Sequence, residues 1–275
     1  MSLVDLYKDR CARINGKLRP HYWQPQVVPY TKPSLYSDEN NICPQEWGVG
    51  SVLSRTLAVN KFLEDDGAGY YVGAALRGSE KLPDHPVIKP LLQSNIKDEK
   101  FHQKGIDNLC ELYSSQKDLE KAKTLASHWR DFIDKYHPLY PVAVLETAVF
   151  TPVLGFWRVF GGITISSAAY HISKDEQRHV QTNRSVLNHL GYDVHETPKD
   201  LLDLTKQTLE WSFENVSIPN KTTPKFDWTI DNLFSVSKDL LEKDESPAYN
   251  ETCFYADYIP HFEDSSNHGY GRAVV

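Results

Sequence analysis

The chain has 275 residues and a formal net charge of -7 at pH 7. Proteins that bind nucleic acid usually cluster basic side chains to neutralise phosphates, so this acidic balance argues against a nucleic-acid partner. The chain is long enough to bury a sizeable core as one helical domain with extra helices.

The cysteines give no sign of a structural metal site or a redox motif. The four cysteines, Cys11, Cys43, Cys110 and Cys253, are far apart in sequence and form no Cys-x-x-Cys motif. The first ten residues include four charged side chains and lack the apolar core of a signal peptide. We therefore expect reduced thiols in a cytoplasmic protein.

The most apolar run extends over residues 142–163, and its composition favours a buried helix over a membrane span. Glu146, Pro152 and Arg158 interrupt it, and charged side chains are costly in lipid. A helix that is apolar nearly all round belongs in the middle of a protein. We expect no membrane span.

Residues 1–44 contain five prolines and several aromatic residues without a helical or alternating pattern, which predicts an arm that orders on docking. Residues 45–245 read as a helical domain and 246–275 as a tail. Apolar residues spaced by three and four predict a first helix from about Glu46, which includes Glu64, Asp65 and Asp66 and ends before Gly67. A second helix follows Pro86 and runs to about Tyr113.

The later elements are also helical. Residues 118–136 predict an amphipathic connecting helix, and a third core helix begins near Pro138 or Pro141 and ends before Gly161 and Gly162. The fourth covers about 164–190 and stops at Gly191, a residue type that commonly caps helices. Two further helices are expected over about 198–215 and 229–244. The fold class is therefore all-α.

One string of residue types occurs twice. Residues 98–102 read Asp-Glu-Lys-Phe-His and residues 175–179 read Asp-Glu-Gln-Arg-His. A Glu and a His three residues apart lie on one helix face about one turn apart, so both can approach one metal ion. The alternative interpretation of either string alone is a solvated surface pair.

Both pairs fall on predicted apolar stripes. Glu99 and His102 lie among Ile96, Ile106 and Leu109, and the second pair is placed in the same way on its own helix. Buried ionisable groups are costly unless they are paired or bound to metal. The repeated string therefore predicts a metal centre.

The arrangement resembles the di-iron carboxylate proteins of the ferritin-like superfamily, in which two helices each give Glu-x-x-His and two others each give one Glu. The resemblance covers roughly residues 46–191, and the second string is close to that of acyl-carrier-protein desaturases and ribonucleotide reductase small subunits. It implies a ferritin-like four-helix bundle with additional helices and long N- and C-terminal arms. It also implies ligands Glu99, His102, Glu176 and His179.

The resemblance implies that the third core helix supplies one more carboxylate ligand. Glu146 is the only acidic residue between Asp134 and Asp175, so it takes that place. The alternative is a buried ion pair of Glu146 with Arg158 or Arg130.

The first core helix must supply the last ligand, and three acidic residues are candidates. We choose Glu64, because the pair Leu63-Glu64 repeats Leu145-Glu146 and because its distance from Glu99 resembles that between the other two carboxylates. Asp65 and Asp66 remain open alternatives.

Asp98 and Asp175 each precede a ligand Glu. As in the related families, we expect each to accept the distal N–H of a ligand His on the neighbouring helix. Four carboxylates and two neutral imidazoles would balance two divalent ions, and oxygen and nitrogen ligands suit iron or manganese, including a mixed pair. Solvated helix positions are the alternative for both aspartates.

By resemblance, the expected function is an O₂-activating di-iron oxidase or oxygenase that acts on a small, largely apolar organic substrate. Electrons would come from a separate donor protein, and a homodimer is a possible assembly. Ile106 and the apolar residues Phe62, Phe150 and Trp157 are expected to wall the substrate chamber.

Two alternatives remain. One is a radical-generating subunit like that of ribonucleotide reductase, although Ile106 stands where that family usually has its radical tyrosine. In that case the tail tyrosines, Tyr255, Tyr258 and Tyr270, could dock a large subunit. The other is a non-catalytic ferritin-like protein that stores iron.

Overall fold

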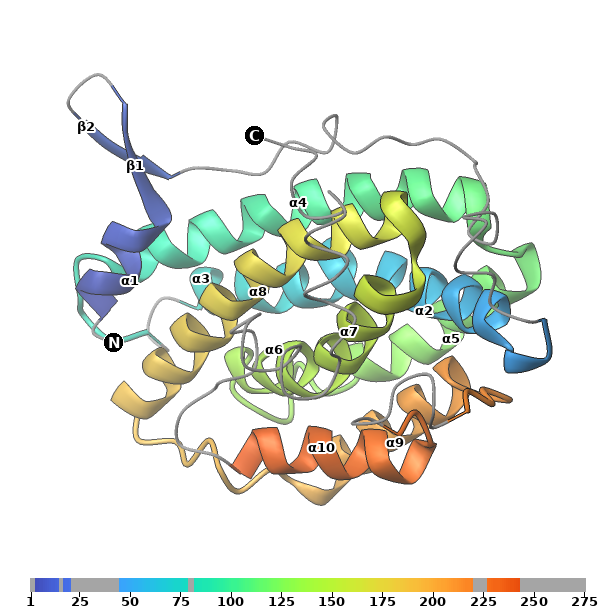
Figure 1. The fold of residues 1–275 in the computed structure, drawn as a ribbon. Coiled ribbons are helices and arrows are strands. Elements are labelled where there is room, and N and C mark those ends of the chain that lie inside the picture. Colours follow the sequence, from blue (N-terminus) through green and yellow to red (C-terminus); the bar gives the residue numbers. More distant parts are fainter. Residues whose placement is uncertain (1–2, 15–16, 21–44, 79–81, 220–226, 243–275) are drawn as a thin grey trace.

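The computed structural model describes residues 3–14, 17–20, 45–78, 82–219 and 227–242 (Figure 1). This part of the chain is mostly helical, which confirms the helical class. The N-terminal elements are α1 (Leu3–Arg10), β1 (Cys11–Ile14), β2 (Lys17–Pro20) and the 3-10 turn η2 (Gln45–Trp47). The helices that follow are α2 (Val49–Leu63), α3 (Tyr70–Arg77), α4 (Ile88–Tyr113), α5 (Gln116–Arg130), α6 (Leu139–Leu145), α7 (Thr151–Phe160), α8 (Gly162–His189), α9 (Lys199–Ser212) and α10 (Ile230–Glu242).

The N-terminal segment differs from the sequence-based expectation. We predicted no regular element before residue 45, whereas the structure contains α1 and an antiparallel hairpin in which Cys11 pairs with Pro20. Asn15-Gly16, between the two strands in sequence, is a strong hairpin signal that our interpretation missed. Residues 21–44 and the tail 246–275, for which we predicted an arm and a tail, lie outside the described residues.

The predicted helix ends at Gly161 and Gly191 are confirmed. The N–H of Gly161 bonds to the carbonyl of Trp157 at the end of α7. Gly191 has φ +79, and Tyr192 N–H bonds to the carbonyl of Leu187. This left-handed closure of α8 is one that glycine adopts without strain. The connecting helix is shorter than predicted, because α5 ends at Arg130 and turns follow it.

Two core helices contain π-helical segments that the sequence did not predict. The segment η3 (Glu64–Gly69) lies between α2 and α3, and η5 (Glu146–Phe150) lies between α6 and α7. A Cβ added at Gly69 would lie 3.3 Å from Cβ of Glu99, so this glycine lets η3 approach α4 closely. Such π turns are rare and occur frequently at functional sites.

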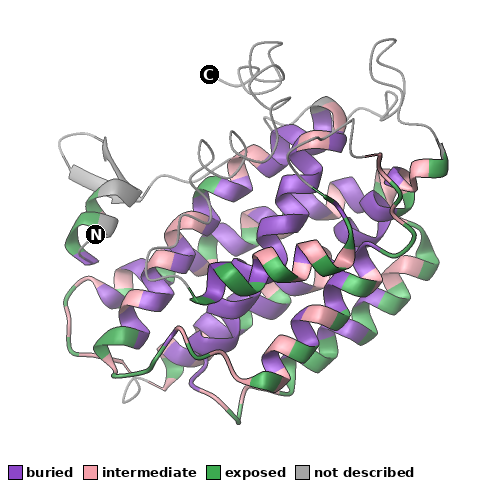
Figure 2. Cartoon of the chain, turned by 60° about the horizontal axis from the view of Figure 1, so that its bottom comes forward, coloured by how far each residue is buried: buried purple, intermediate pink, exposed green. Residues whose placement is uncertain are grey.

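The core lies between α2, α4, α6–η5–α7 and α8. Lys61 on α2 pairs with Asp107 on α4, and Trp157 on α7 donates to Thr56 on α2 at 2.8 Å. With Ser54 of α2 bonded to Asp118, just beyond the end of α4, these contacts make α2 antiparallel to α4. Figure 2 shows buried residues along the inner faces of the helices and exposed residues on the outer ones. In Figure 1, α9 and α10 lie together on one side of this core.

The apolar run predicted as a buried helix is indeed internal. The stretch Leu139–Phe160 is long and apolar enough to cross a membrane, yet its residues are buried inside the protein except for Val159, which is partly buried. This is the behaviour of a helix that packs inside a protein core.

Candidate metal centre

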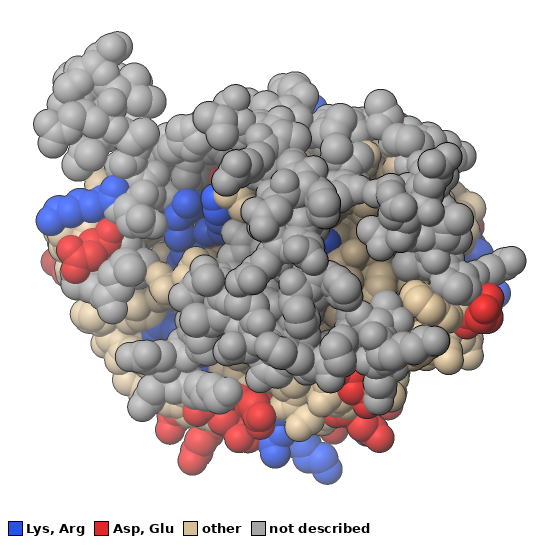
Figure 3. Space-filling model, viewed as in Figure 1, with Lys and Arg blue, Asp and Glu red and all other residues tan. Residues whose placement is uncertain are grey.

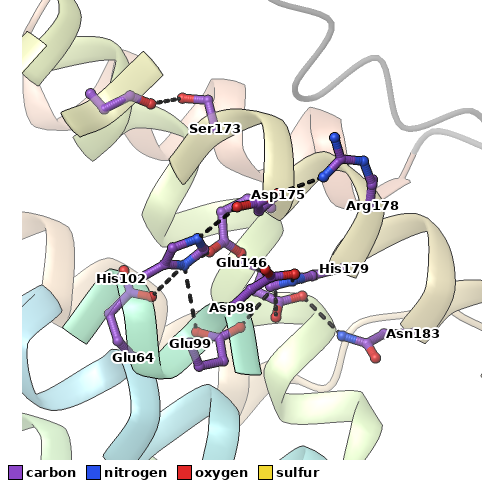
Figure 4. A network of polar contacts seen from close by, with 12 residues as sticks. Glu64, Asp98, Glu99, His102, Glu146, Ser173, Asp175, Arg178, His179 and Asn183 are labelled. Carbon is purple, nitrogen blue, oxygen red and sulfur yellow. Dashed lines mark hydrogen bonds and ion pairs between the residues drawn. The ribbon is translucent and has the colours of Figure 1, made fainter. Parts of the chain in front are cut away.

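The structure brings all six predicted metal ligands together at the centre of the helices. Figure 4 labels all of them except Glu176. Glu64 begins η3 and Glu146 begins η5, whereas α4 and α8 each contribute a Glu and a His. None of the six is more than 1% exposed. They form two groups, Glu64, Glu99, His102 and Glu176 in one and Glu99, Glu146, Glu176 and His179 in the other. In each group the candidate ligand atoms lie within 4.8 Å of one another, so each could hold a metal ion.

The first group surrounds Nδ1 of His102. This atom lies 3.2 Å from Oε2 of Glu64, 3.1 Å from Oε1 of Glu176 and 4.0 Å from Oε2 of Glu99. Three helical segments therefore direct carboxylates at one imidazole nitrogen, which is the donor set of an oxygen- and nitrogen-ligated metal ion.

The second group repeats this arrangement around Nδ1 of His179. That atom lies 2.8 Å from Oε1 of Glu99, 3.4 Å from Oε2 of Glu176 and 3.7 Å from Oε1 of Glu146. The two imidazole rings are 5.9 Å apart between centroids.

Glu99 and Glu176 belong to both groups. Each offers one oxygen toward His102 and the other toward His179. Carboxylates placed in this way can bridge two cations, whereas Glu64 and Glu146 can each serve only one side. Two adjacent cations could therefore share these two carboxylates.

The imidazole nitrogens that face away from the cluster contact Asp98 and Asp175. Nε2 of His179 lies 3.2 Å from Oδ2 of Asp98, and Nε2 of His102 lies 3.3 Å from Oδ2 of Asp175. These are the cross-helix contacts that the sequence analysis expected. An N–H at Nε2 bonded to a carboxylate leaves Nδ1 to bind a cation, although the metal-orienting role of these aspartates stays a prediction.

The two groups differ at their unshared carboxylates. Asn183 donates from Nδ2 to Oε2 of Glu146 at 3.0 Å, so an amide holds this carboxylate in place. Oε2 of Glu64 instead contacts Nδ1 of His102. Sequence reasoning placed Asn183 on the buried stripe of α8 without a role, although its position one turn after His179 was a usable signal.

The carboxylates lack the partners that buried carboxylates need. Six of their eight oxygens accept no well-aligned hydrogen bond from the described residues: Oε1 of Glu64, Oε1 of Glu146 and both oxygens of Glu99 and Glu176. Leaving a buried charged group unsatisfied costs several kcal/mol, about 1–3 kcal/mol even for a neutral one. Two divalent cations would satisfy these oxygens and balance the charge, so the residues fit the metals that the sequence implies.

Burial also affects the protonation of these ligand side chains. It raises the pKa of Glu64 and of Glu146 well above the ordinary value, and it raises that of Glu99. For Glu176 burial acts in the same direction, but His179 and His102 outweigh it and lower the pKa. Burial alone would lower the pKa of His102 and His179. The surrounding carboxylates have the larger effect, so the pKa of both histidines is raised well above the ordinary value. Protons therefore compete with cations for this site.

The structure distinguishes between the three acidic residues that the sequence offered as the ligand from the first core helix. Glu64 is fully buried in the cluster, Asp65 is only half-buried, and Asp66 is exposed and lies 3.3 Å from Arg130. Only Glu64 belongs to a metal-competent group. Arg130 pairs with Asp66, Arg158 donates to the carbonyl of Ser166, and Glu146 accepts from Asn183. The geometry therefore favours the cluster over a Glu146–arginine pair.

The residues expected around a substrate chamber have different environments. Ile106, Phe150 and Trp157 are fully buried, and Phe62 is partly exposed. The indole N–H of Trp157 is occupied by Thr56. The chamber itself stays a prediction, and the tail tyrosines of the radical-subunit alternative lie outside the described residues.

Comparisons with protein families, with curated proteins and with solved structures found no significant match to this chain. The geometry of the site therefore carries the functional argument.

Proposed function

We propose that this protein is a ferritin-like di-iron enzyme that activates O₂ to oxidise a small, largely apolar organic substrate. The observation that carries the proposal is the sharing of Glu99 and Glu176 between two buried ligand groups. A structural zinc site would be a closed tetrahedron, commonly with thiolates, whereas this cluster has only carboxylates and imidazoles in overlapping sets. The four core helical segments that supply it support a ferritin-like bundle.

Iron ions bound at the two positions would supply the electrons for O₂ reduction, and manganese or a mixed pair is compatible with the same ligands. The protein neutralises the ion charges with four carboxylates and orients the imidazoles through Asp98 and Asp175. Its buried surroundings exclude water from the site.

The proposal implies further partners. O₂ and the organic substrate must reach a fully buried centre, and a separate donor protein would supply electrons. We propose a cytoplasmic location and a homodimer as the simplest assembly.

The test is anaerobic loading of the full chain with ferrous ion, followed by elemental analysis and O₂ uptake. We expect about two irons per chain and O₂ consumption that Glu99→Ala abolishes, because this change removes a ligand from both groups. Glu210→Ala is the matched control, since Glu210 lies on α9 in an exposed pair with Lys206.

Other results would redirect the proposal. Less than half an equivalent of iron plus manganese in protein from metal-replete cells would overturn it. A stable tyrosyl radical after exposure to O₂ would indicate the ribonucleotide-reductase-like function, and accumulation of ferric mineral would indicate storage.

A further inference from the structure

Asn60 is a fully buried amide with no partner in the described part of the chain. Its side chain is 0% exposed, and neither Nδ2 nor Oδ1 forms a hydrogen bond there. An unsatisfied buried amide is destabilising, and few are found in folded proteins. Asn60 plays no part in the metal groups, so its cost calls for a different explanation.

The direction of Asn60 follows from its neighbours on α2. Lys61 faces α4, where it pairs with Asp107, and Thr56 faces α7, where it accepts from Trp157. At about 100° per residue, Asn60 lies in the sector between these two directions, as Glu64 does. Asn60 therefore faces the space between the core helices, about 6 Å along the helix axis from Glu64.

The other helices present apolar residues at this height. Ile106 is next to Asp107, which pairs with Lys61, and lies one turn beyond His102 on α4. Trp157 contacts Thr56, and α7 runs antiparallel to α2, so Val153, one turn before Trp157, lies at the height of Asn60. Ile172 lies about one turn before Glu176 on α8. All three are 0% exposed. Asn60 is thus a polar group at the same height as three buried aliphatic side chains.

This layer adjoins the Glu64–His102 side of the metal groups. Oε2 of Glu64 contacts His102, and Oε1 of Glu64 has no hydrogen-bonding partner among the described residues. A molecule in the layer would be beside Glu64 and His102 and could satisfy the Asn60 amide.

We propose that Asn60, Ile106, Val153 and Ile172 form the substrate-binding layer of the enzyme, on the Glu64–His102 side of the centre. This inference rests on the proposed function. An Asn amide both donates and accepts, so the fitting substrate is apolar and has one uncharged group that does the same, such as a primary amide or a hydroxyl. A carboxylate or ammonium group is disfavoured, because a buried charge requires a counter-charge.

Three probes of one size test this chemistry on the metal-loaded full chain: butanamide, its apolar isostere 2-methylpentane, and butanoate. Binding is measured from the concentration dependence of the thermal midpoint. Wild-type protein should bind butanamide more tightly than butanoate. Asn60→Leu should weaken butanamide binding about tenfold and leave 2-methylpentane binding unchanged or stronger, because the ligand amide then loses its partner.

Asn95→Leu is the matched control. Asn95 is also buried with an unpaired Nδ2, but it lies on α4 one turn before Glu99, on the opposite side of the centre. This control variant should bind butanamide as tightly as wild-type protein does. Asn60→Ala serves as a second variant if the leucine is not accommodated. It should also bind butanamide more weakly than wild-type protein does.

The outcomes separate this inference from the proposed function. Metal content and O₂ uptake test the function, whereas probe preference tests the layer. Equal butanamide binding by wild-type and both Asn60 variants would overturn the layer, as would loss of metal from either variant, because Asn60 would then support the centre instead. Absence of probe binding to a protein that holds two irons would overturn it as well.

Discussion

Oδ2 of Asp98 lies 3.2 Å from Nε2 of His179, so a carboxylate on α4 contacts an imidazole on α8. The same relationship runs in the other direction, because Asp175 on α8 contacts His102 on α4. Each helix thereby positions the histidine of its neighbour while presenting its own histidine to the cluster. The two Asp-Glu-x-x-His strings are structurally interdependent, and single substitutions should have effects on both helices.

Replacing a shared carboxylate should cost more metal than replacing an unshared one. We expect Glu99→Ala and Glu176→Ala to lose both ions, because each residue belongs to both groups. Glu64→Ala and Glu146→Ala should each retain about one ion. Elemental analysis after gel filtration measures this difference, and equal losses from all four variants would contradict the shared geometry.

The aspartates should tune metal affinity without providing ligands. Asp98→Ala and Asp175→Ala are expected to bind metal about 10–100-fold more weakly, the usual effect of losing the partner of a ligand histidine. Competition with a chelator measures the affinity. The exposed Asp239 on α10 provides the control Asp239→Ala. Unchanged affinity in both test variants would reduce Asp98 and Asp175 to helix-packing roles.

The contact between Trp157 and Thr56 should stabilise the packing of α7 on α2. Thr56→Val keeps the side-chain shape but leaves the buried indole N–H without its acceptor, at a cost of about 1–3 kcal/mol in the free energy of unfolding. Urea denaturation measures it. Thr124→Val is the control, because its hydroxyl also bonds a carbonyl one turn earlier but is exposed, and it should change stability by less than about 0.5 kcal/mol.

Cys110 should be unreactive in the folded protein. Burial raises the pKa of its thiol to about 11, so the nucleophilic thiolate is scarce at pH 8. Peptide mapping after iodoacetamide treatment should show slow modification of Cys110 in the native chain and rapid modification in urea. Because the folded pKa is the higher one, this group contributes stability below pH 9, and that contribution is lost as the pH rises toward 11. Rapid native alkylation at pH 8 would contradict this.

Much of the site was predictable, because its spacing follows the helical repeat. Glu99 with His102 and Glu176 with His179 are one turn apart on apolar stripes, and burial of such pairs is costly without a cation. The choice of Glu64 over Asp65 and Asp66 depended on a Leu-Glu pair repeated at Glu146 and on similar sequence distances to the next ligand Glu. The structure places that residue, and neither neighbouring aspartate, in the cluster.

What the sequence did not predict depends on contacts between distant segments. The π turns at Glu64 and Glu146 insert an extra residue into a regular repeat, which no apolar periodicity shows in advance. The roles of Asn183 and Asn60 likewise depend on which residues face them across the core. The N-terminal hairpin is a different case, because the Asn15-Gly16 pair was present in the sequence and was overlooked.

The contribution of α8 to both ligand groups has a consequence for biosynthesis. Each group requires Glu176, so neither is complete until the ribosome has synthesised α8, well past the middle of the chain. Glu64, Glu99 and His102 are therefore synthesised before Glu146 and Glu176 exist. Under the proposed function, metal capture would be a late event in maturation. Truncation before α8 should yield a chain whose carboxylates stay unneutralised and which becomes a substrate for chaperones or proteases.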